Sequence, residues 1–287
     1  MIASIDTIEI VNKSQLIEYF LSGNKPKSAW GIGTEHEKFL YHRPDLKRLA
    51  YDSKPGIQEI LKHLMATDWL PIYENGNLIG LKKDGASISL EPGGQYELSG
   101  KNIKTIHDTY EETKKHFDEL KLISSKFDVL NMALGFDPLW SREAMPWMPK
   151  KRYEIMKAYM PTKGNMGLDM MTRTATIQVN LDYENEKDMI RKMRVAQAIQ
   201  PIATALFANS PFTDGKPNGY LSFRSQVWEH TDPDRCGFLP FIFDDDFSFE
   251  RWTDYLLDVP MYFIYRDGGY IPSNNITFRE FMNGKHH

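Results

Sequence analysis

The clearest pattern along the chain is an alternation of apolar and polar residues, which predicts β-strands. It is visible over residues 30–43 and again over residues 72–91. The second stretch contains Asn75-Gly76 and Asp84-Gly85, and both dipeptides are typical of two-residue hairpin turns. This stretch therefore predicts an antiparallel meander. Further strands are predicted over residues 129–136, 170–183 and 259–266.

Helices are predicted where apolar residues recur at helical spacing. A short helix should follow Ser14, a potential N-cap, and stop at Gly23, and a second should begin at Pro55. A long amphipathic helix is predicted over residues 102–126, with apolar positions at Ile103, Ile106, Tyr110, Phe117 and Leu120. Two more are predicted over residues 148–160 and 186–208. Strands and helices do not alternate regularly, so we expect an α+β fold built on an antiparallel sheet.

Composition and charge narrow the possible functions. The 287 residues are enough for one large domain or two small ones. The net charge is −4 and there is no basic tract, so we expect no nucleic-acid partner. The longest apolar stretch, residues 202–208, is far too short to span a bilayer, so we expect no membrane association.

The termini and the cysteine content bear on location. Residues 1–14 lack a positively charged segment followed by an apolar one, so no signal peptide is expected. Cys236 is the single cysteine and excludes an internal disulfide framework. Together these features predict a cytoplasmic protein. His286-His287 is either a natural terminus or the start of a purification tag.

Four glutamates stand out because they occur in or beside predicted strands. Glu35 and Glu37 share a strand face and should lie roughly 6–7 Å apart at the usual rise per residue. Glu91 and Glu97 flank Pro92-Gly93-Gly94, which breaks regular strand geometry. If the two segments are neighbours in one sheet, four carboxylates gather on one surface. Such a cluster repels itself unless a cation neutralises it, and Mg²⁺ or Mn²⁺ prefers oxygen ligands.

A plainer interpretation of these glutamates stays open at this point. Alternating acids on an antiparallel strand usually mark a face that is exposed to solvent. Gly93-Gly94 is equally compatible with an ordinary turn.

Longer motifs carry a resemblance to a known family. The segments are GTEHEKF, SLEPGGQYELSG, MPKKRYEIMKAYMP, GLDMMTRTATIQVNLDY, QPIATALFANSPFTDGKPNGYLSFRSQVW and DVPMYFIYRDGGYI. Together they closely resemble the glutamate–cysteine ligases of plants and proteobacteria, from about residue 10 to residue 282. The resemblance implies ligation of L-glutamate to L-cysteine with ATP as co-substrate, the first step of glutathione synthesis.

The same resemblance implies a fold and a set of site residues. The fold would be similar to the catalytic part of glutamine synthetase, a curved antiparallel sheet with helices on its outside. Mg²⁺, or Mn²⁺ in its place, would be held around the ATP phosphates by Glu35, Glu37, Glu91 and Glu97. The concave face of the sheet would then be the active site.

Other residues match the family's motifs with open alternatives. Arg152 and Arg224 resemble arginines that bind substrate carboxylate or phosphoryl groups, and Arg224 would also take part in catalysis. A surface ion pair is the alternative for a lone arginine. Gln178 and Asn180 share a strand face and would bind ATP, unless they are an ordinary exposed polar pair. Tyr262 resembles an aromatic of the cysteine pocket, although core packing is the more frequent role of such a residue.

Two further residues are expected to be structural. His36 has the opposite strand parity to Glu35 and Glu37, so it should not be a metal ligand. Cys236 matches no catalytic position.

The chain also departs from the family pattern. Family members are normally much longer, so residues 1–287 are interpreted as a single catalytic domain that is incomplete at its C-terminus. Ala175 stands where many relatives have cysteine, and the lone Cys236 argues against disulfide-based redox control. Two alternatives to the ligase remain: a related γ-glutamyl ligase with another amine acceptor, and an inactive or regulatory protein that binds ATP or glutamate. The oligomeric state is not predicted.

Overall fold

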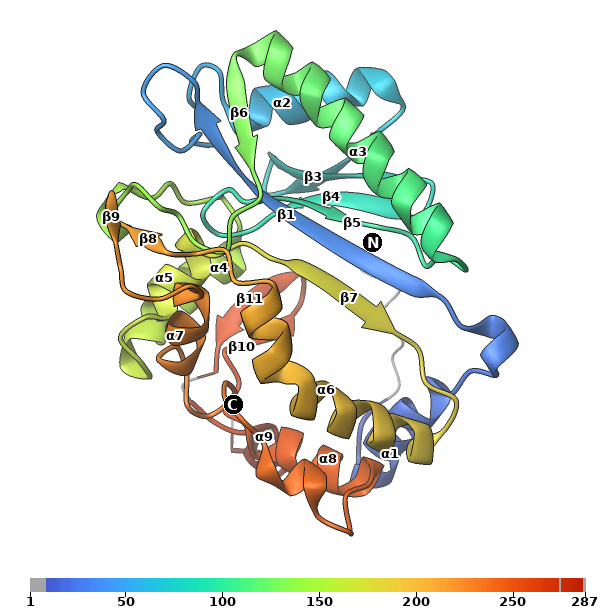
Figure 1. Cartoon of the computed structure of the whole chain (residues 1–287). Coiled ribbons are helices and arrows are strands. Elements are labelled where there is room, and N and C mark those ends of the chain that lie inside the picture. The colour runs from blue at the N-terminus through green and yellow to red at the C-terminus, as the bar shows by residue number, and fades with distance from the viewer. Residues whose placement is uncertain (1–8, 274, 286–287) are drawn as a thin grey trace. The chain divides into compact units, whose positions relative to one another are not determined.

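The computed structural model of the protein describes residues 9–273 and 275–285 (Figure 1). Residues 1–8, which belong to the segment considered for a signal peptide, lie outside these described residues. The His286-His287 pair, considered as a possible tag, also lies outside them. The chain forms two compact units. The first comprises residues up to Trp30, Asp182–Ile199 and the residues from Phe238 onward, and the second comprises Gly31–Leu181 and Gln200–Gly237. The assignment of the chain to one catalytic domain stays a prediction.

An antiparallel sheet forms the centre of the second unit. Its order is β2-β3-β4-β5-β1-β6, and β7 also pairs with β1. All of these pairs are antiparallel, which confirms the α+β prediction. The strands are β1 (Ile32–His42), β2 (Leu70–Glu74), β3 (Asn77–Lys83), β4 (Ala86–Leu90), β5 (Tyr96–Ser99), β6 (Val129–Met132) and β7 (Ile177–Leu181).

The predicted meander is confirmed together with its two turns. The backbone is left-handed at Asn75 and Gly76, with φ of 48° and 79°, and again at Asp84 and Gly85, with φ of 49° and 87°. Positive φ at both central residues is the requirement of a tight hairpin turn, and Asn, Asp and Gly adopt it most readily. These turns align β2, β3 and β4 as neighbours.

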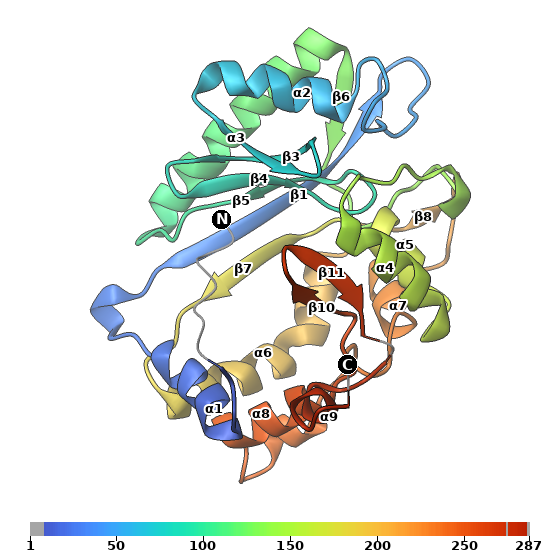
Figure 2. The same ribbon diagram turned by 180° about the vertical axis from the view of Figure 1, so that it is seen from behind.

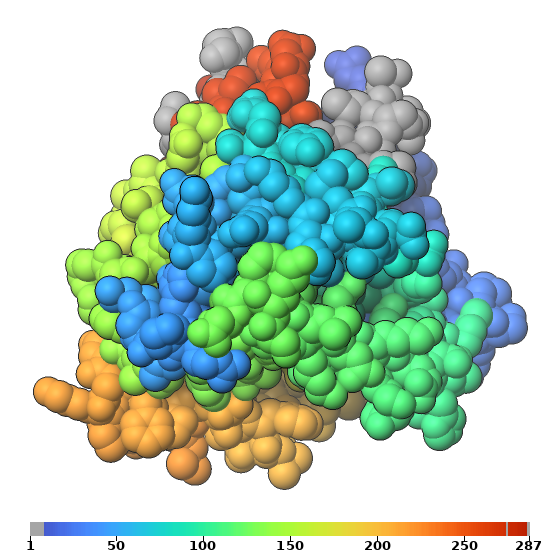
Figure 3. Space-filling model, turned by 90° about the horizontal axis from the view of Figure 1, so that it is seen from above, coloured from blue at the N-terminus to red at the C-terminus, as the bar shows by residue number. Residues whose placement is uncertain are grey.

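Helices α2 (Ile57–Leu64) and α3 (Ile106–Phe127) lie over one face of this sheet (Figure 1). Seen from above, their segments form much of the surface on that side (Figure 3). The buried positions of α2 are apolar: Ile57, Ile60, Leu61 and Leu64. The predicted buried face of the long helix was partly wrong. Ile103 precedes the helix, and Ile106 and Tyr110 are 71% and 64% exposed, because α3 turns His116, Leu120 and Ile123 inward.

Shorter elements complete the second unit: α4 (Lys151–Tyr159), α5 (Gly167–Arg173), β8 (Phe212–Thr213), β9 (Lys216–Pro217) and α7 (Phe223–Glu229). Figure 2 shows α4, α5 and α7 from behind. The strand predicted over residues 170–183 begins only at Ile177, and residues 170–173 instead form the end of α5. There Thr172 and Thr174 donate side-chain hydrogen bonds to the carbonyls of Leu168 and Met170, so burial and local hydrogen bonds override β-propensity.

The first unit is mainly helical. It contains α1 (Lys13–Ser22), the first part of α6 (Glu186–Leu206), α8 (Phe249–Asp258), β10 (Phe263–Arg266), β11 (Gly269–Pro272) and α9 (Phe278–Met282). Its core centres on Met189, Ile242, Phe247 and Phe249. The N-cap of α1 is Asn12 rather than Ser14, because the Asn12 side chain accepts the Gln15 N–H. The strand predicted from residue 259 begins only at Phe263.

Single 3-10 turns connect several of these elements: η1 (Lys27–Ala29), η2 (Met65–Thr67), η3 (Arg142–Ala144), η4 (Met160–Thr162) and η5 (Pro240–Phe243). Among the helices of the described residues, none combines the length and the apolar character that crossing a membrane requires.

Candidate active site

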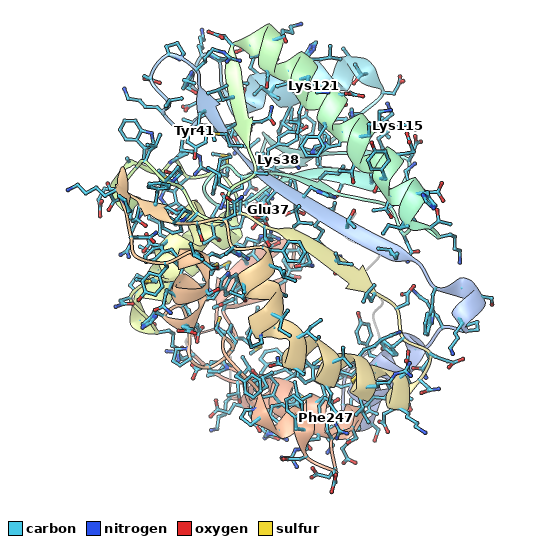
Figure 4. The ribbon with its side chains drawn as sticks, in the orientation of Figure 1. Glu37, Lys38, Tyr41, Lys115, Lys121 and Phe247 are labelled. Carbon is cyan, nitrogen blue, oxygen red and sulfur yellow. The ribbon has the colours of Figure 1, made fainter. Side chains whose placement is uncertain are left out.

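Two carboxylates face each other on the side of the sheet opposite α3. In the antiparallel pair of β1 and β5, Glu37 stands directly opposite Glu97. Figure 4 labels Glu37 and Lys38, which follow one another on β1 and therefore point to opposite faces of the sheet. Glu97 is only 8% exposed. Like charges in directly opposed positions destabilise a sheet, so this pair needs a reason other than stability.

The protonation of Glu37 reflects this crowding. Burial, followed by the negative charges of Glu91 and Glu97, raises the pKa of Glu37 to about 8. The Arg224 guanidinium and the Thr176 N–H act in the opposite direction. The pKa of Glu97 is also raised, chiefly by burial. At neutral pH Glu37 is therefore mostly protonated in the metal-free protein.

Glu35 is held by two amide side chains from the neighbouring strand. Its Oε1 accepts hydrogen bonds from Gln178 Nε2 at 3.0 Å and from Asn180 Nδ2 at 2.9 Å. Gln178 also donates to Asn180 Oδ1 at 3.0 Å. The register of β1 and β7 places Glu35 opposite Gln178, so the three side chains share the face of Glu37. The sequence prediction that Gln178 and Asn180 point into one site is compatible with this arrangement.

The loop between β4 and β5 carries Glu91 and leads to Glu97. It closes on itself, because the Glu91 N–H donates to the Gln95 carbonyl and the Gly94 N–H donates to the Glu91 carbonyl. Gly93 packs against the backbone of Thr172, where a Cβ atom would lie 2.3 Å from the Thr172 oxygen. Glycine is therefore required at position 93 for close packing and not only for a turn.

Two cationic side chains lie beside Glu91. Lys150 Nζ is buried and donates to the Leu90 carbonyl at 2.8 Å, and Arg152 Nη2 donates to the Tyr153 hydroxyl at 3.2 Å. The same hydroxyl donates to the Leu90 carbonyl at 2.7 Å. Burial, followed by the positive charge of Arg152, lowers the pKa of Lys150 to about 8, although Glu91 and Glu97 oppose the shift.

Arg224 reaches this cluster from α7. Its guanidinium lies 5.5 Å from the centre of the Trp228 ring, and the backbone N–H of Arg224 donates to Ser210 Oγ at 3.1 Å. Burial lowers the pKa of Arg224, and the charge of Glu37 raises it. The structure thus brings Glu35, Glu37, Glu91, Glu97, Arg152, Gln178, Asn180 and Arg224 into one unit. Tyr262 belongs to the other unit, so its role stays a prediction.

The opposite face of β1 holds a second buried polar group that the sequence pattern did not suggest. Lys38 donates to the His36 carbonyl at 3.1 Å and lies 5.2 Å from the Phe117 ring. Tyr96 and His116 stack with ring centres 6.0 Å apart. Burial lowers the pKa of Lys38 to about 8 and that of His36 to about 4. His36 faces α3, as its strand parity predicts, so it is not on the carboxylate face.

Sequence reasoning also missed Lys150 and Arg48, which are buried cations of the second unit. Lys150 could have been found from the sequence, because it lies two residues before Arg152 in the same motif. Nothing in the local sequence pattern singles out Arg48. Burial raises the pKa of the Cys236 thiol, which agrees with a structural role for it.

The carboxylates do not form a ready metal site. In residues 9–273 and 275–285, no group of three or more His, Cys, Asp or Glu side chains is arranged to hold a metal ion. The donor set still suits a hard cation, because burial and then the neighbouring carboxylates raise the pKa of Glu37, and a positive ion would favour its ionised form. Mg²⁺ often takes one or two protein carboxylates and completes its shell with water and phosphate oxygens. Mg²⁺ or Mn²⁺ at these glutamates stays a prediction.

Comparison with known proteins adds an independent finding. Residues 31–285 match the model of glutamate–cysteine ligase family 2. The chain is 52% identical over 278 residues to the glutamate–cysteine ligase of Medicago truncatula. The aligned region covers 96% of this chain and 54% of that protein. It is 52% identical over 283 residues to ligase A of Oryza sativa subsp. japonica, with 98% of this chain and 57% of that protein covered. The ligase of Arabidopsis thaliana is 51% identical over 278 residues, with 96% and 53% covered.

These matches bear on the predicted location and on the length of the chain. All three relatives are named as chloroplastic, so the prediction of a cytoplasmic location was wrong. The low cysteine content misled here, because it indicates a reducing compartment without saying which one. The chain spans about half the length of the curated relatives it matches.

Proposed function

The chain belongs to glutamate–cysteine ligase family 2, and from this premise we propose that it catalyses ATP-dependent ligation of the γ-carboxylate of L-glutamate to the amine of L-cysteine. This would be the first step of glutathione synthesis. The observation that carries the proposal is the opposed pair of Glu37 and Glu97, with Glu91 beside it, on one face of the sheet. Such a costly arrangement of acids is expected where a site has to hold cations and phosphate groups.

The reaction proceeds in two steps. The γ-carboxylate of glutamate attacks the γ-phosphorus of ATP, which gives γ-glutamyl phosphate and ADP. The amine of cysteine then attacks the acyl carbon, phosphate leaves with the electrons of the C–O bond, and the amine loses a proton. No protein nucleophile is needed, so catalysis depends on positioning and on neutralising charge.

Residues of the second unit divide these tasks. Glu35, Glu37, Glu91 and Glu97 would hold Mg²⁺, which supplies charge neutralisation at the phosphates when it is bound. Gln178 and Asn180 fix the orientation of Glu35 through its Oε1 and would contact ATP beside it. The amide groups and the carboxylate thereby support one another's geometry.

Arginines would bind the anionic parts of the substrates. Arg224 lies close enough to Glu37 for their charges to interact, so it can stabilise the phosphoryl group as charge develops during transfer. Arg152, held by the Tyr153 hydroxyl, would bind a substrate carboxylate. Tyr262 would line the cysteine pocket.

The proposal also covers the fold and the domain organisation of the chain. The antiparallel sheet with helices on one face supports a fold similar to the catalytic part of glutamine synthetase. We include the interpretation that the two units work as one catalytic domain. A ligase that uses another amine acceptor, and a protein that binds ATP or glutamate without turnover, remain the alternatives.

The test is phosphate release from ATP in the presence of Mg²⁺ and glutamate, with and without cysteine. Cysteine-dependent release together with γ-glutamylcysteine in the products is the expected result. Release that depends on a different amine would favour the related ligase. Nucleotide binding with no release would favour the binding protein and contradict the proposed activity.

A further inference from the structure

Arg48 is a buried cation that joins three segments far apart in the sequence. Its side chain is 2% exposed. Its Nη2 donates to the Gly93 carbonyl at 2.7 Å, and its Nη1 donates to Asp137 Oδ2 at 3.1 Å and to the Thr172 carbonyl at 3.3 Å. We propose that Arg48 is a positioning residue that sets the spacing between Glu91, the carboxylate of the β4–β5 loop, and Glu37. The inference rests on the proposed function.

The first link runs from Arg48 to the loop that contains Glu91. Gly93 lies two residues after Glu91, and its carbonyl accepts the shortest of the hydrogen bonds from Arg48. Gln95 holds the same loop from the other side, because its Nε2 donates to the carbonyls of Met171 at 3.2 Å and Thr174 at 2.7 Å. The loop is therefore fastened to the end of α5 at two points: at Gly93 through the Arg48 side chain, and at Gln95 through its own side chain.

The second link runs from the end of α5 to Glu37. Thr172 accepts from Arg48, and Thr176 follows four residues later. The Thr176 N–H donates to Glu37 Oε2 at 3.0 Å, and the Glu37 N–H donates to the Thr176 carbonyl at 3.0 Å. The backbone of Thr176 therefore orients the Glu37 carboxylate. If the segment from Thr172 to Thr176 shifted, Glu37 would shift with it relative to the β4–β5 loop.

The third link anchors Arg48 itself. Asp137 is fully buried, and its Oδ1 accepts the N–H groups of Leu139 and Trp140 at 3.0 Å. Its Oδ2 accepts from Arg48 and from the Tyr41 hydroxyl, both at 3.1 Å. The carboxylate is satisfied by these four donors and cannot swing away. It compensates the charge of Arg48 and fixes the plane of the guanidinium.

Arginine is specifically suited to this place. Its planar fork presents several donors in fixed directions, so two nitrogens can serve Asp137 and Gly93 at once. The guanidinium also lies 4.3 Å from the centre of the Phe39 ring, which restrains it further. A lysine could keep the ion pair with Asp137, but a single ammonium cannot span the same set of acceptors. Arg48→Lys therefore preserves the buried charge while it releases the loop.

The experiment measures Mn²⁺ binding by electron paramagnetic resonance on the full chain. Arg48→Lys is expected to weaken Mn²⁺ binding by roughly 10- to 100-fold, the usual effect of losing a group that orients metal ligands. The control is Arg235→Lys, where a partly buried arginine pairs with the fully buried Asp232 and lies 5.4 Å from the centre of the Tyr159 ring. It should lower thermal stability comparably and leave Mn²⁺ affinity unchanged. Equal Mn²⁺ affinity in both variants and the unchanged protein would overturn the inference.

A double variant distinguishes positioning from general destabilisation. Glu91→Gln should itself weaken Mn²⁺ binding, and adding Arg48→Lys should cause little further loss if Arg48 acts through the loop. Fully additive losses would contradict the inference while leaving the proposed metal site intact. If the unchanged protein binds no Mn²⁺, the proposed metal site fails, and the role of Arg48 fails with it.

A second variant guards against misfolding of Arg48→Lys. Gln95→Met removes the two loop contacts to Met171 and Thr174 but leaves Arg48 paired with Asp137. It should weaken Mn²⁺ binding in the same direction. A folded Gln95→Met protein with unchanged Mn²⁺ affinity would show that the loop needs no clamp to hold Glu91 in place, and would overturn the inference.

Discussion

Glu37 and Glu97 are directly opposed residues of two antiparallel strands, and both are carboxylates. A sheet normally avoids this pairing. In the metal-free protein the conflict is resolved by a proton, because burial and the neighbouring charges raise the pKa of Glu37 to about 8. With a cation present, the proton would no longer be needed. The relationship therefore leads to predictions about pH, metal and stability.

The first prediction concerns stability against pH without divalent cations. The folded-state pKa of Glu37 lies above its usual value of 4.5, so the folded protein binds the proton more tightly than the unfolded chain does. Stability should then fall as pH rises from about 4.5 to about 8. Glu37→Gln should flatten this part of the profile. Urea midpoints at pH 6 and pH 8.5 measure it, and an equally steep profile in the variant would count against the assignment.

The second prediction concerns protons released when metal binds. With a pKa of about 8, Glu37 is mostly protonated at pH 7 and mostly ionised at pH 9, and binding a cation requires the ionised form. Titration calorimetry with Mn²⁺ in two buffers of different ionisation enthalpy should show clear proton release at pH 7 and much less at pH 9. Release that does not change with pH would exclude Glu37 as the group that responds.

The third prediction concerns acid sensitivity on the helix side of the sheet. Burial, followed by the charges of Lys38 and His36, lowers the pKa of His116 to about 3. The stability that depends on neutral His116 is complete above pH 6.5 and is lost as pH falls toward 3. His116→Phe keeps an aromatic ring against Tyr96 and should reduce the loss between pH 6.5 and 4.5. His107→Phe, at an exposed site on α3, serves as control and should change nothing in thermal melts.

The fourth prediction concerns close packing at Gly93. A Cβ atom there would lie 2.3 Å from the Thr172 oxygen and 2.7 Å from its Cα, both backbone atoms that cannot turn aside. Gly93→Ala should lower the free energy of unfolding by about 1–3 kcal/mol through overpacking. Gly269→Ala is the control, since its Cβ would lie 3.6 Å from the nearest atom. Equal urea midpoints for the two variants would contradict the packing argument.

The fifth prediction concerns Arg224 in catalysis. Arg224→Met removes a positive charge that interacts with Glu37 and should lower the rate of cysteine-dependent phosphate release by roughly 10²–10³-fold. Arg43→Met is the control, because Arg43 is half exposed in its ion pair with Asp128 and should affect the rate little. Similar rates for the two variants would place Arg224 outside the chemistry.

Several features of this protein were determined by local sequence. The hairpin turns at Asn75-Gly76 and Asp84-Gly85 follow from residues that tolerate positive φ, and the strands that flank them follow from the alternation of apolar and polar residues. The common face of Glu35 and Glu37 follows from the two-residue repeat of a strand. Family membership follows from motifs long enough to exclude chance, which the match over residues 31–285 confirms.

Tertiary structure decided which residues from distant parts of the chain come into contact, because sequence periodicity does not specify such contacts. The pairing of β1 with β5 put Glu97 opposite Glu37, and no local pattern specifies which residues of distant strands face each other. Burial between the sheet and α3 turned His116 inward in place of Ile106. Arg48 acquired its role only when Gly93, Asp137 and Thr172 came within reach of one guanidinium. The chain encodes candidate ligands locally, whereas their spacing and protonation are properties of long-range contacts.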